Sequence, residues 1–265
     1  MTKIAVVIPY FNYPEKLIAS IRSIDETGGH AIDIVVVDDG STDKLDLKTI
    51  EDYRYGKIHL ITFKENQGVN FARNAALEWI VEQGEYSLIG FLDAGDFCLP
   101  NRFKIQIEYL KNNPEVKLIG SQVNFVNMNR EFLYTTKLPS KYAELKKMFY
   151  LNSQVFQPAA MMKTEIISKI GYYPKTYKIA TDYGYFFKIL ERFRVENIDI
   201  PLIDYVVDDT SISSTKRKEQ VRTRIRVILE HFYFGYYPIY GLLRNIALLF
   251  VSRDFSDRIK RLIYR

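Results

Sequence analysis

Short runs of apolar, β-branched residues alternate with helical segments through roughly the first hundred residues of this chain. The runs from Ile4 to Ile8 and from Ile34 to Val37 are continuously apolar, which is typical of strands covered on both faces. Pro14 opens a segment with helical spacing, and residues 70–81 form another. Strands that alternate with helices in this way build a mostly parallel sheet with helices on both faces. Further candidate strands lie at residues 58–62 and 88–92.

After Asn101 the pattern becomes mixed. Residues 116–126 and 132–134 predict a hairpin, residues 195–207 are extended, and helical segments lie at 103–110, 141–151, 164–170 and 182–193. We find no repeat and no linker between the halves, so residues 1–215 are predicted to form one α/β domain with halves at 1–100 and 101–215. A basic helical tail, residues 216–265, is predicted to follow.

Composition excludes several classes of site. The chain has 265 residues and one cysteine, Cys98, which rules out a disulfide framework and favours a reducing, cytoplasmic setting. Its three histidines, at His30, His59 and His231, are too scattered to build a Cys/His zinc cage. No segment reaches the roughly 18 uncharged apolar residues of an obvious membrane span.

The charge is concentrated at the carboxyl-terminal end. Residues 216–265 hold 12 Lys and Arg against 4 Asp and Glu, which leaves a net charge of −3 for residues 1–215. Cations interleaved with aromatic and aliphatic residues on helices suit an anionic bilayer surface. Nucleic acid is not predicted as a partner, because no nucleic-acid fold motif accompanies the patch. A helical lid packed on the core is the alternative. The basic residues of the tail's interleaved pattern are Arg222, Arg224, Arg226, Arg244, Arg253, Arg258, Lys260, Arg261 and Arg265.

Carboxylates follow two of the predicted strands. Asp38 and Asp39 end one strand, and Asp93 and Asp96 follow another. Ligands of open α/β sheets bind outside the carboxyl ends of the strands, so these residues are candidate ligand contacts. A single acidic pair after a strand can equally be a turn former or a helix cap.

Four segments together resemble a known family. Residues 6–12 (VVIPYFN), 36–43 (VVDDGSTD), 66–74 (NQGVNFARN) and 91–96 (FLDAGD) are similar, in order and spacing, to the motifs of family 2 inverting glycosyltransferases of the GT-A fold. The resemblance covers about residues 3–210. It implies transfer of a sugar from a nucleotide donor to a hydroxyl of a glycan or lipid-linked glycan in bacterial surface-polysaccharide synthesis. Among nucleotide donors, a UDP-sugar is the one we expect. The first half would then bind the nucleotide sugar and the second half the acceptor.

The resemblance assigns donor contacts that the side chains can perform. Pro9 would lie against the nucleotide, and Gly68 would let the backbone approach the donor. Asp39 would accept a hydrogen bond from a ring N–H of the base, since an ionised carboxylate only accepts. Arg73 would offer planar donors to phosphate or base, although a helix-surface ion pair is its alternative role.

Asp93, Ala94, Gly95 and Asp96 occupy the place of the family's Asp-x-Asp motif, which holds a divalent cation, Mn²⁺ or Mg²⁺. Such a dication stabilises the charge that a departing nucleoside diphosphate gains. Gly95 stands where many members have a second Asp. Either Asp93 and Asp96 converge on the ion, or Asp93 binds ribose and metal together, or the enzyme depends only weakly on metal.

Asp182 resembles the family's catalytic carboxylate, at the start of a helix. An inverting transfer needs a general base at the acceptor hydroxyl, and Asp182 is the residue we expect to serve. Thr181 stands where Glu is frequent, and helix capping is the competing role for Asp182.

Gly95 and Thr181 leave open a catalytically silent nucleotide-sugar-binding or scaffolding protein. A nucleotidyltransferase or Rossmann dehydrogenase is disfavoured, because no Gly-rich loop follows the first strand. A cytoplasmic enzyme bound peripherally to the inner face of the cell membrane is expected.

Overall fold

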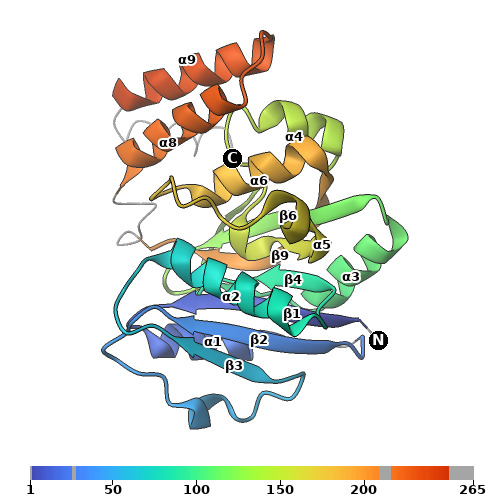
Figure 1. Cartoon of the computed structure of the whole chain (residues 1–265), viewed down its shortest axis with the longest axis vertical. Coiled ribbons are helices and arrows are strands. Elements are labelled where there is room, and N and C mark those ends of the chain that lie inside the picture. The colour runs from blue at the N-terminus through green and yellow to red at the C-terminus, as the bar shows by residue number, and fades with distance from the viewer. Residues whose placement is uncertain (1, 26–27, 209–215, 251–265) are drawn as a thin grey trace.

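The computed structural model describes residues 2–25, 28–208 and 216–250 (Figure 1). The strands are β1 (Lys3–Tyr10), β2 (Ala31–Asp38), β3 (Ile58–Thr62), β4 (Leu88–Phe91), β5 (Phe97–Cys98), β6 (Val116–Val126), β7 (Phe132–Thr135), β8 (Met161–Lys163) and β9 (Arg194–Val206). The helices are α1 (Pro14–Arg22), α2 (Val69–Gln83), α3 (Arg102–Asn112), α4 (Tyr142–Met148), α5 (Glu165–Ile170), α6 (Thr181–Arg192), α8 (Arg217–Glu230) and α9 (Tyr236–Phe250), with 3-10 turns η1 (Leu47–Ile50) and η2 (Gln157–Ala159).

One sheet runs through both halves of the sequence. Its order is β3-β2-β1-β4-β8-β6-β9-β5, and β7 pairs with β6 outside this path. The first four of these strands are mutually parallel. The mixed part begins where β8 pairs antiparallel with both β4 and β6. A parallel sheet half merged with a mixed half confirms the predicted fold class, and β6 with β7 forms the predicted hairpin.

The parallel half is buried on both faces because its side chains alternate between two cores. On one face Ala5 and Val7 of β1 pack in the cluster that contains Ala76 and Ile80 of α2. On the other face Val6 of β1 lies in the cluster that contains residues of α1 and α3. The continuously apolar run thus supplies both cores, because alternate side chains point to opposite faces. Parallel pairing places the carboxyl ends of these strands at one edge of the sheet.

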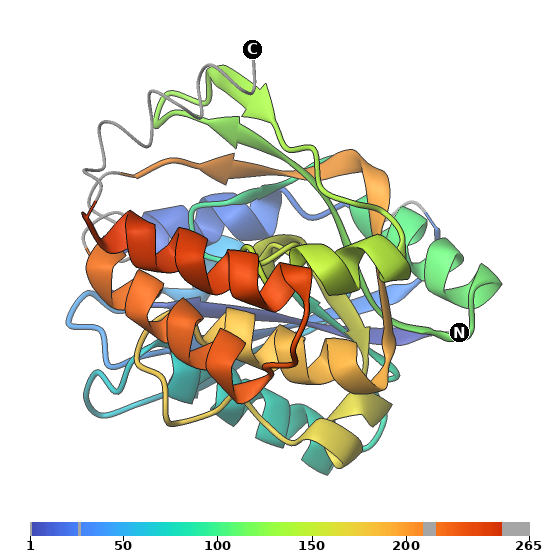
Figure 2. The same ribbon diagram turned by 90° about the horizontal axis from the view of Figure 1, so that it is seen from above.

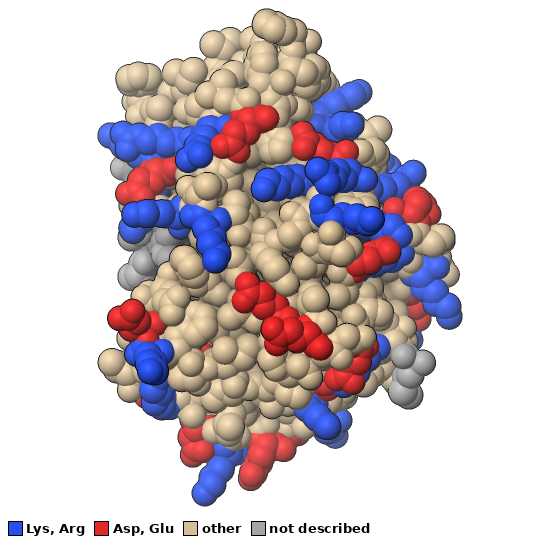
Figure 3. All heavy atoms as spheres, in the orientation of Figure 1, with Lys and Arg blue, Asp and Glu red and all other residues tan. Residues whose placement is uncertain are grey.

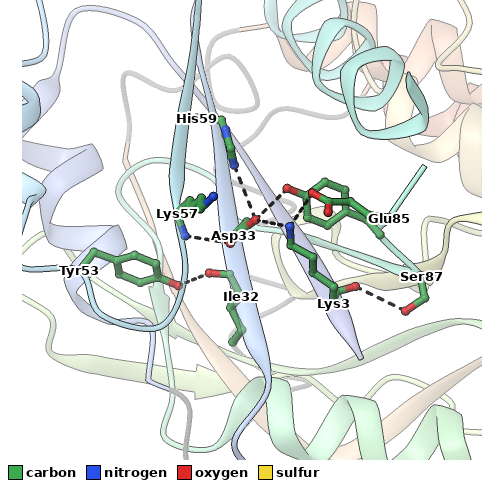
Figure 4. A network of polar contacts seen from close by, with 9 residues as sticks. Lys3, Ile32, Asp33, Tyr53, Lys57, His59, Glu85 and Ser87 are labelled. Atoms are coloured by element: carbon green, nitrogen blue, oxygen red, sulfur yellow. Dashed lines mark hydrogen bonds and ion pairs between the residues drawn. The ribbon is translucent and has the colours of Figure 1, made fainter. Parts of the chain in front are cut away.

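A polar network lies at the opposite end of the parallel strands (Figure 4). The buried carboxylate of Asp33 accepts hydrogen bonds from the Tyr86 hydroxyl at 2.8 Å and the Lys57 backbone N–H at 2.8 Å. The Lys3 ammonium lies 3.1 Å from Asp33 and also pairs with Glu85. Burial opposes the ionised Asp33, but these donors outweigh it and hold the pKa of Asp33 below its usual range. The network joins β1, β2 and the segment before β4.

The tail helices stack on the second half. Figures 1 and 2 show α9 beside α8 and α8 over α6. α9 approaches the core closely at Gly241, since a Cβ added there would lie 2.1 Å from the Tyr150 carbonyl oxygen. Part of the predicted tail therefore does pack on the core. Residues 251–265, with Arg253, Arg258, Lys260, Arg261 and Arg265, lie outside the described residues, as does the predicted end of the α/β domain at residue 215. Within the described ranges, no helix combines the length and apolar character needed to cross a bilayer.

Candidate active site

A cavity of about 210 Å³ opens at the carboxyl ends of β1 and β4. Two of the predicted site residues, Pro9 and Asp93, line it together. The half-exposed rings of Phe11 and Tyr13 lie at the same cavity, beside the α2 residue Val69. The remaining lining residues are Tyr10, Lys16 and Ala94. The cavity is therefore where an open α/β sheet places its ligand.

Asp39 and Gly68 meet next to this cavity. The buried Asp39 carboxylate accepts hydrogen bonds from the backbone N–H groups of Gln67 at 2.8 Å and Gly68 at 2.9 Å. Burial raises the pKa of Asp39, and these two bonds oppose that rise. Gly68 has φ of 98°, and a Cβ there would meet nothing within 4 Å, so its positive φ, not crowding, requires glycine. Asp39 thus fastens the loop after β2 to the start of α2.

Arg73 and Asp93 form a close ion pair. The Arg73 guanidinium on α2 donates to Asp93 Oδ1 at 2.7 Å, and the Arg73 side chain is buried while that of Asp93 is 36% exposed. Burial works against the charged guanidinium, but Asp93, Tyr173 and Asp182 outweigh it and raise the pKa of Arg73. The pairing partner is a predicted site residue, so Arg73 is not a helix-surface ion pair.

Asp182 belongs to the same charged cluster. It lies in the first turn of α6 and is half-buried. Burial raises the pKa of Asp182, the Arg73 guanidinium lowers it, and Asp93 raises it further. The structure therefore brings Arg73, Asp93 and Asp182 into electrostatic contact, although they are far apart in sequence. A raised pKa suits a proton acceptor better than the ordinary value of an exposed carboxylate does.

The backbone around Asp182 is held in place by α2. Ala180, immediately before α6, has φ of 52°, a conformation that costs a non-glycine residue about 1 kcal/mol or more. The Thr181 hydroxyl is hydrogen-bonded to the Asn70 side chain of α2. Thr181, which stands where Glu is frequent, thus ties the start of α6 to α2.

Asp96 is not among the residues that line the cavity. It is buried, and its Oδ1 accepts a hydrogen bond from the Val206 backbone N–H of β9 at 2.9 Å. Burial, and then the nearby Asp93, hold the pKa of Asp96 well above its usual range. Gly95 has φ of 104°, and its N–H donates to the Ser20 hydroxyl at 2.8 Å. The turn between Asp93 and Asp96 is therefore shaped by glycine, and a metal role for Asp96 stays a prediction.

Sequence reasoning missed Lys16. This α1 residue lines the cavity, lies over the Tyr13 ring and pairs with Asp208 at 3.0 Å, just beyond β9. In the sequence Lys16 looks like any solvent-facing residue near a helix start. Its ion pair joins segments that are 192 residues apart, a contact that no local pattern indicates.

A parallel sheet half with a cavity at its strand ends, and a second carboxylate brought in by a mixed half, defines a GT-A glycosyltransferase. The chain belongs to Glycosyl transferase family 2, whose sequence profile matches residues 5–171. It is similar to the UDP-Glc:alpha-D-GlcNAc-diphosphoundecaprenol beta-1,3-glucosyltransferase WfgD of Escherichia coli, with 26% identity over 83% of each chain.

Two solved structures share the fold. S. aureus TarS 1–349, in complex with UDP-GlcNAc, matches with a TM-score of 0.66 and 19% identity, over 92% of this chain and 72% of that one. The mannosyltransferase PcManGT of Pyrobaculum calidifontis, in complex with GDP-Man and Mn²⁺, matches with a TM-score of 0.62 and 18% identity, over 94% of this chain and 70% of that one. At this identity the likeness shows the GT-A fold alone.

Proposed function

We propose that this glycosyltransferase moves a sugar from a UDP-sugar to a hydroxyl of a lipid-linked glycan during surface-polysaccharide synthesis. The observation that carries the proposal is the cluster of Asp93, Arg73 and Asp182 beside a cavity at the strand ends. The name of the relative WfgD gives UDP-Glc as donor and GlcNAc-diphosphoundecaprenol as acceptor, which supports this choice.

The donor would lie across the carboxyl ends of β1 and β2. Pro9 lines the cavity, and Phe11 and Tyr13 offer apolar faces to a base or ribose. Each carboxylate oxygen of Asp39 has room for more than one donor. Asp39 can therefore keep its bonds to Gln67 and Gly68 and accept the ring N–H of uracil as well.

The acceptor hydroxyl would be activated by Asp182. Inversion is a single displacement, so one carboxylate suffices and no covalent intermediate forms. Arg73 favours the ionised form of Asp182, because it lowers a pKa that burial raises. The same guanidinium holds Asp93 Oδ1. Arg73 therefore interacts both with Asp93, on the donor side of the cavity, and with the proposed general base Asp182.

The residues present fit a divalent cation held mainly by the substrate. No group of three acidic, His or Cys side chains in the described ranges could cage an ion by itself. Mg²⁺ and Mn²⁺ at nucleotide sites are commonly held by one or two carboxylates plus phosphate oxygens, and Asp93 can supply such a carboxylate. When bound, the ion would stabilise the charge gained by the departing UDP.

The tail would place the enzyme at the inner face of the cell membrane. α9 exposes an apolar face (Figure 3, the uncharged region at the top), and Lys and Arg side chains gather beneath it. An apolar face bordered by cations suits insertion into an anionic leaflet. The exposed apolar residues of this surface, which we call the α9 face, are Tyr236, Ile239, Tyr240, Leu243, Ile246 and Phe250, with Phe234 just before the helix.

Substitution of the proposed base tests the assignment. Asp182→Asn should lower the transfer rate by about 10²- to 10⁴-fold, while UDP-sugar binding, followed by titration calorimetry, changes less than about twofold. Lys178→Gln, an exposed residue just before α6, is the control and should leave both unchanged. Unaltered turnover in Asp182→Asn would remove Asp182 from the mechanism. Donor binding without any turnover in the wild type would instead support the silent sugar-nucleotide-binding alternative.

Metal binding in the presence of UDP distinguishes the roles of the two predicted metal ligands, Asp93 and Asp96. With UDP present, Mn²⁺ should raise the Tm of the wild type by mass action. Asp93→Asn should abolish that increase, and Asp96→Asn should preserve it, because Asn keeps the acceptor that bonds to Val206. An increase that depends on Asp96 and not on Asp93 would reverse the assignment.

A further inference from the structure

Arg224 of α8 faces into the molecule. It lies three residues after Val221 and four before Ile228, and both are buried, so the three side chains share one face of the helix. Arg222 and Arg226 on either side are exposed, whereas Arg224 is half-buried. Val227 packs against the first turn of α6, since its Cγ2 would lie 3.5 Å from a Cβ added to Gly184. α8 therefore covers the turn that carries Asp182.

The Arg224 guanidinium has no partner among the described residues: no hydrogen bond or ion pair reaches it. Arg226 on the neighbouring turn is satisfied by Glu230 at 3.0 Å. Burial lowers the pKa of Arg224, and the nearby cations Arg244 and Arg217 lower it further, against Tyr183 and Asp182. Asp182 is thus the only carboxylate named among the groups that act on Arg224. A half-buried cation in this position is stabilised if an anion binds beside it.

The anion must belong to the acceptor side. The charges that act on Arg224 come from α6, α8 and α9, and all of these follow the donor-binding half in sequence. The cavity at the strand ends is lined by residues of the first half. Arg224 acts on the proposed base from the α8 side, and Arg73 acts on it from the α2 side. An anion at Arg224 would therefore lie across Asp182 from the donor.

We propose that Arg224, assisted by Arg217 and Arg244, binds a phosphate of the acceptor, so that the acceptor is a sugar carried on a phosphate-linked lipid and not a free glycan. This inference rests on the proposed function and deepens it. A guanidinium is the side chain best shaped for phosphate, which it can bind with two parallel hydrogen bonds. α9 packs against α8, which carries Arg224, and exposes its own apolar face. A lipid chain would then continue from the phosphate along the α9 face.

A sugar-free probe tests the subsite independently of turnover. The probes are a medium-length alkyl diphosphate and the uncharged alcohol of the same chain, with binding followed by calorimetry below micelle-forming concentration. The alkyl diphosphate should bind the wild type, and Arg224→Gln should weaken it by about tenfold or more. Arg224→Lys should retain part of the affinity. Arg222→Gln removes the same charge from an exposed position of the same helix and should change affinity less than twofold.

Three measurements separate this proposal from its rivals. UDP affinity should be equal in the wild type and Arg224→Gln, and a parallel loss would place Arg224 at the donor and overturn the proposal. Equal weakening by Arg222→Gln would show general surface attraction and also overturn it. In Arg224→Gln the KM for a GlcNAc diphosphate alkyl ester should rise, so that kcat/KM for this acceptor falls. Transfer to the matching alkyl glycoside should stay unchanged. If the wild type binds no UDP-sugar but binds the alkyl diphosphate, the proposed donor fails and the subsite stands.

Discussion

The surroundings of Asp182 disfavour its ionised form. Burial raises its pKa in the folded protein above the value in the unfolded chain, so the ionised carboxylate destabilises the fold at neutral pH. Asp182→Asn should therefore raise the Tm at neutral pH by roughly 2–4 °C, corresponding to about 1 kcal/mol. At pH about 4 the difference should shrink, because the wild-type carboxyl takes up its proton as the pH falls. Differential scanning fluorimetry at both pH values measures this, and a less stable variant at neutral pH would contradict it.

Arg73 sets the pH range in which Asp182 can accept a proton. Its guanidinium lowers the pKa of Asp182, so Arg73→Gln should move the acid limb of the kcat profile to higher pH by roughly one unit. The pairing with Asp93 is lost in the same variant, so the plateau should fall as well. The exposed Arg222→Gln is the matched control, whose limb should not move. An acid limb that stays in place in Arg73→Gln would mean that another group is titrating.

At the scale of single elements, the Asp33 network fastens β1 and β2 at the end opposite the cavity. Its donors hold the pKa of Asp33 below the unfolded value, so its stabilisation is complete above the unfolded pKa and is lost as pH falls through the folded pKa. Asp33→Asn should cost about 2 kcal/mol at neutral pH and much less in acid. Urea unfolding measures both. Asp52→Asn, at an exposed 3.9 Å pair with Arg22, should cost less than about 0.5 kcal/mol. Equal losses at both positions would contradict a structural role for the network.

The parallel half could be predicted because its signal is local. Continuous β-branched runs predict β1 and β2, and the helical spacing of residues 70–81 predicts α2. β5 and β8 are two and three residues long, too short for any period to register. Their places in the sheet depend on partners far along the chain, such as Cys98 opposite Ile203.

The candidate site divides in the same way. Asp39, Asp93 and Asp182 stand in motifs that could be read directly. The hydrogen bonds of the neighbouring residues could not be read in this way. Asp96 bonds to Val206 and Thr181 bonds to Asn70, which are 110 and 111 residues away in sequence. Lys16 and Arg224 look like ordinary helix-surface cations in the sequence. Only the packing of α1 and α8 shows that they face the site, so no sequence pattern could have indicated them.

For the molecule as a whole, the α9 face predicts where lipid contact occurs. Phe234 and Phe250 are 91% and 84% exposed, and burying each ring stabilises binding by about 1.5 kcal/mol. Phe234→Ser with Phe250→Ser should therefore weaken binding to anionic vesicles by about tenfold or more, as measured by flotation. Phe132→Ser with Leu133→Ser, at exposed positions of β7, is the matched control and should leave binding unchanged. Equal binding by both double variants would place the lipid contact elsewhere.

α9 packs on α8, and α8 covers the turn that carries Asp182. This arrangement has a kinetic consequence. An enzyme held to a leaflet by this helix meets a lipid-borne acceptor by lateral diffusion, so encounters occur in two dimensions. Turnover would then follow the number of acceptor molecules per unit area of leaflet. Adding bare vesicles at a fixed total amount of acceptor would slow the reaction, even though no concentration in the bulk solution had changed.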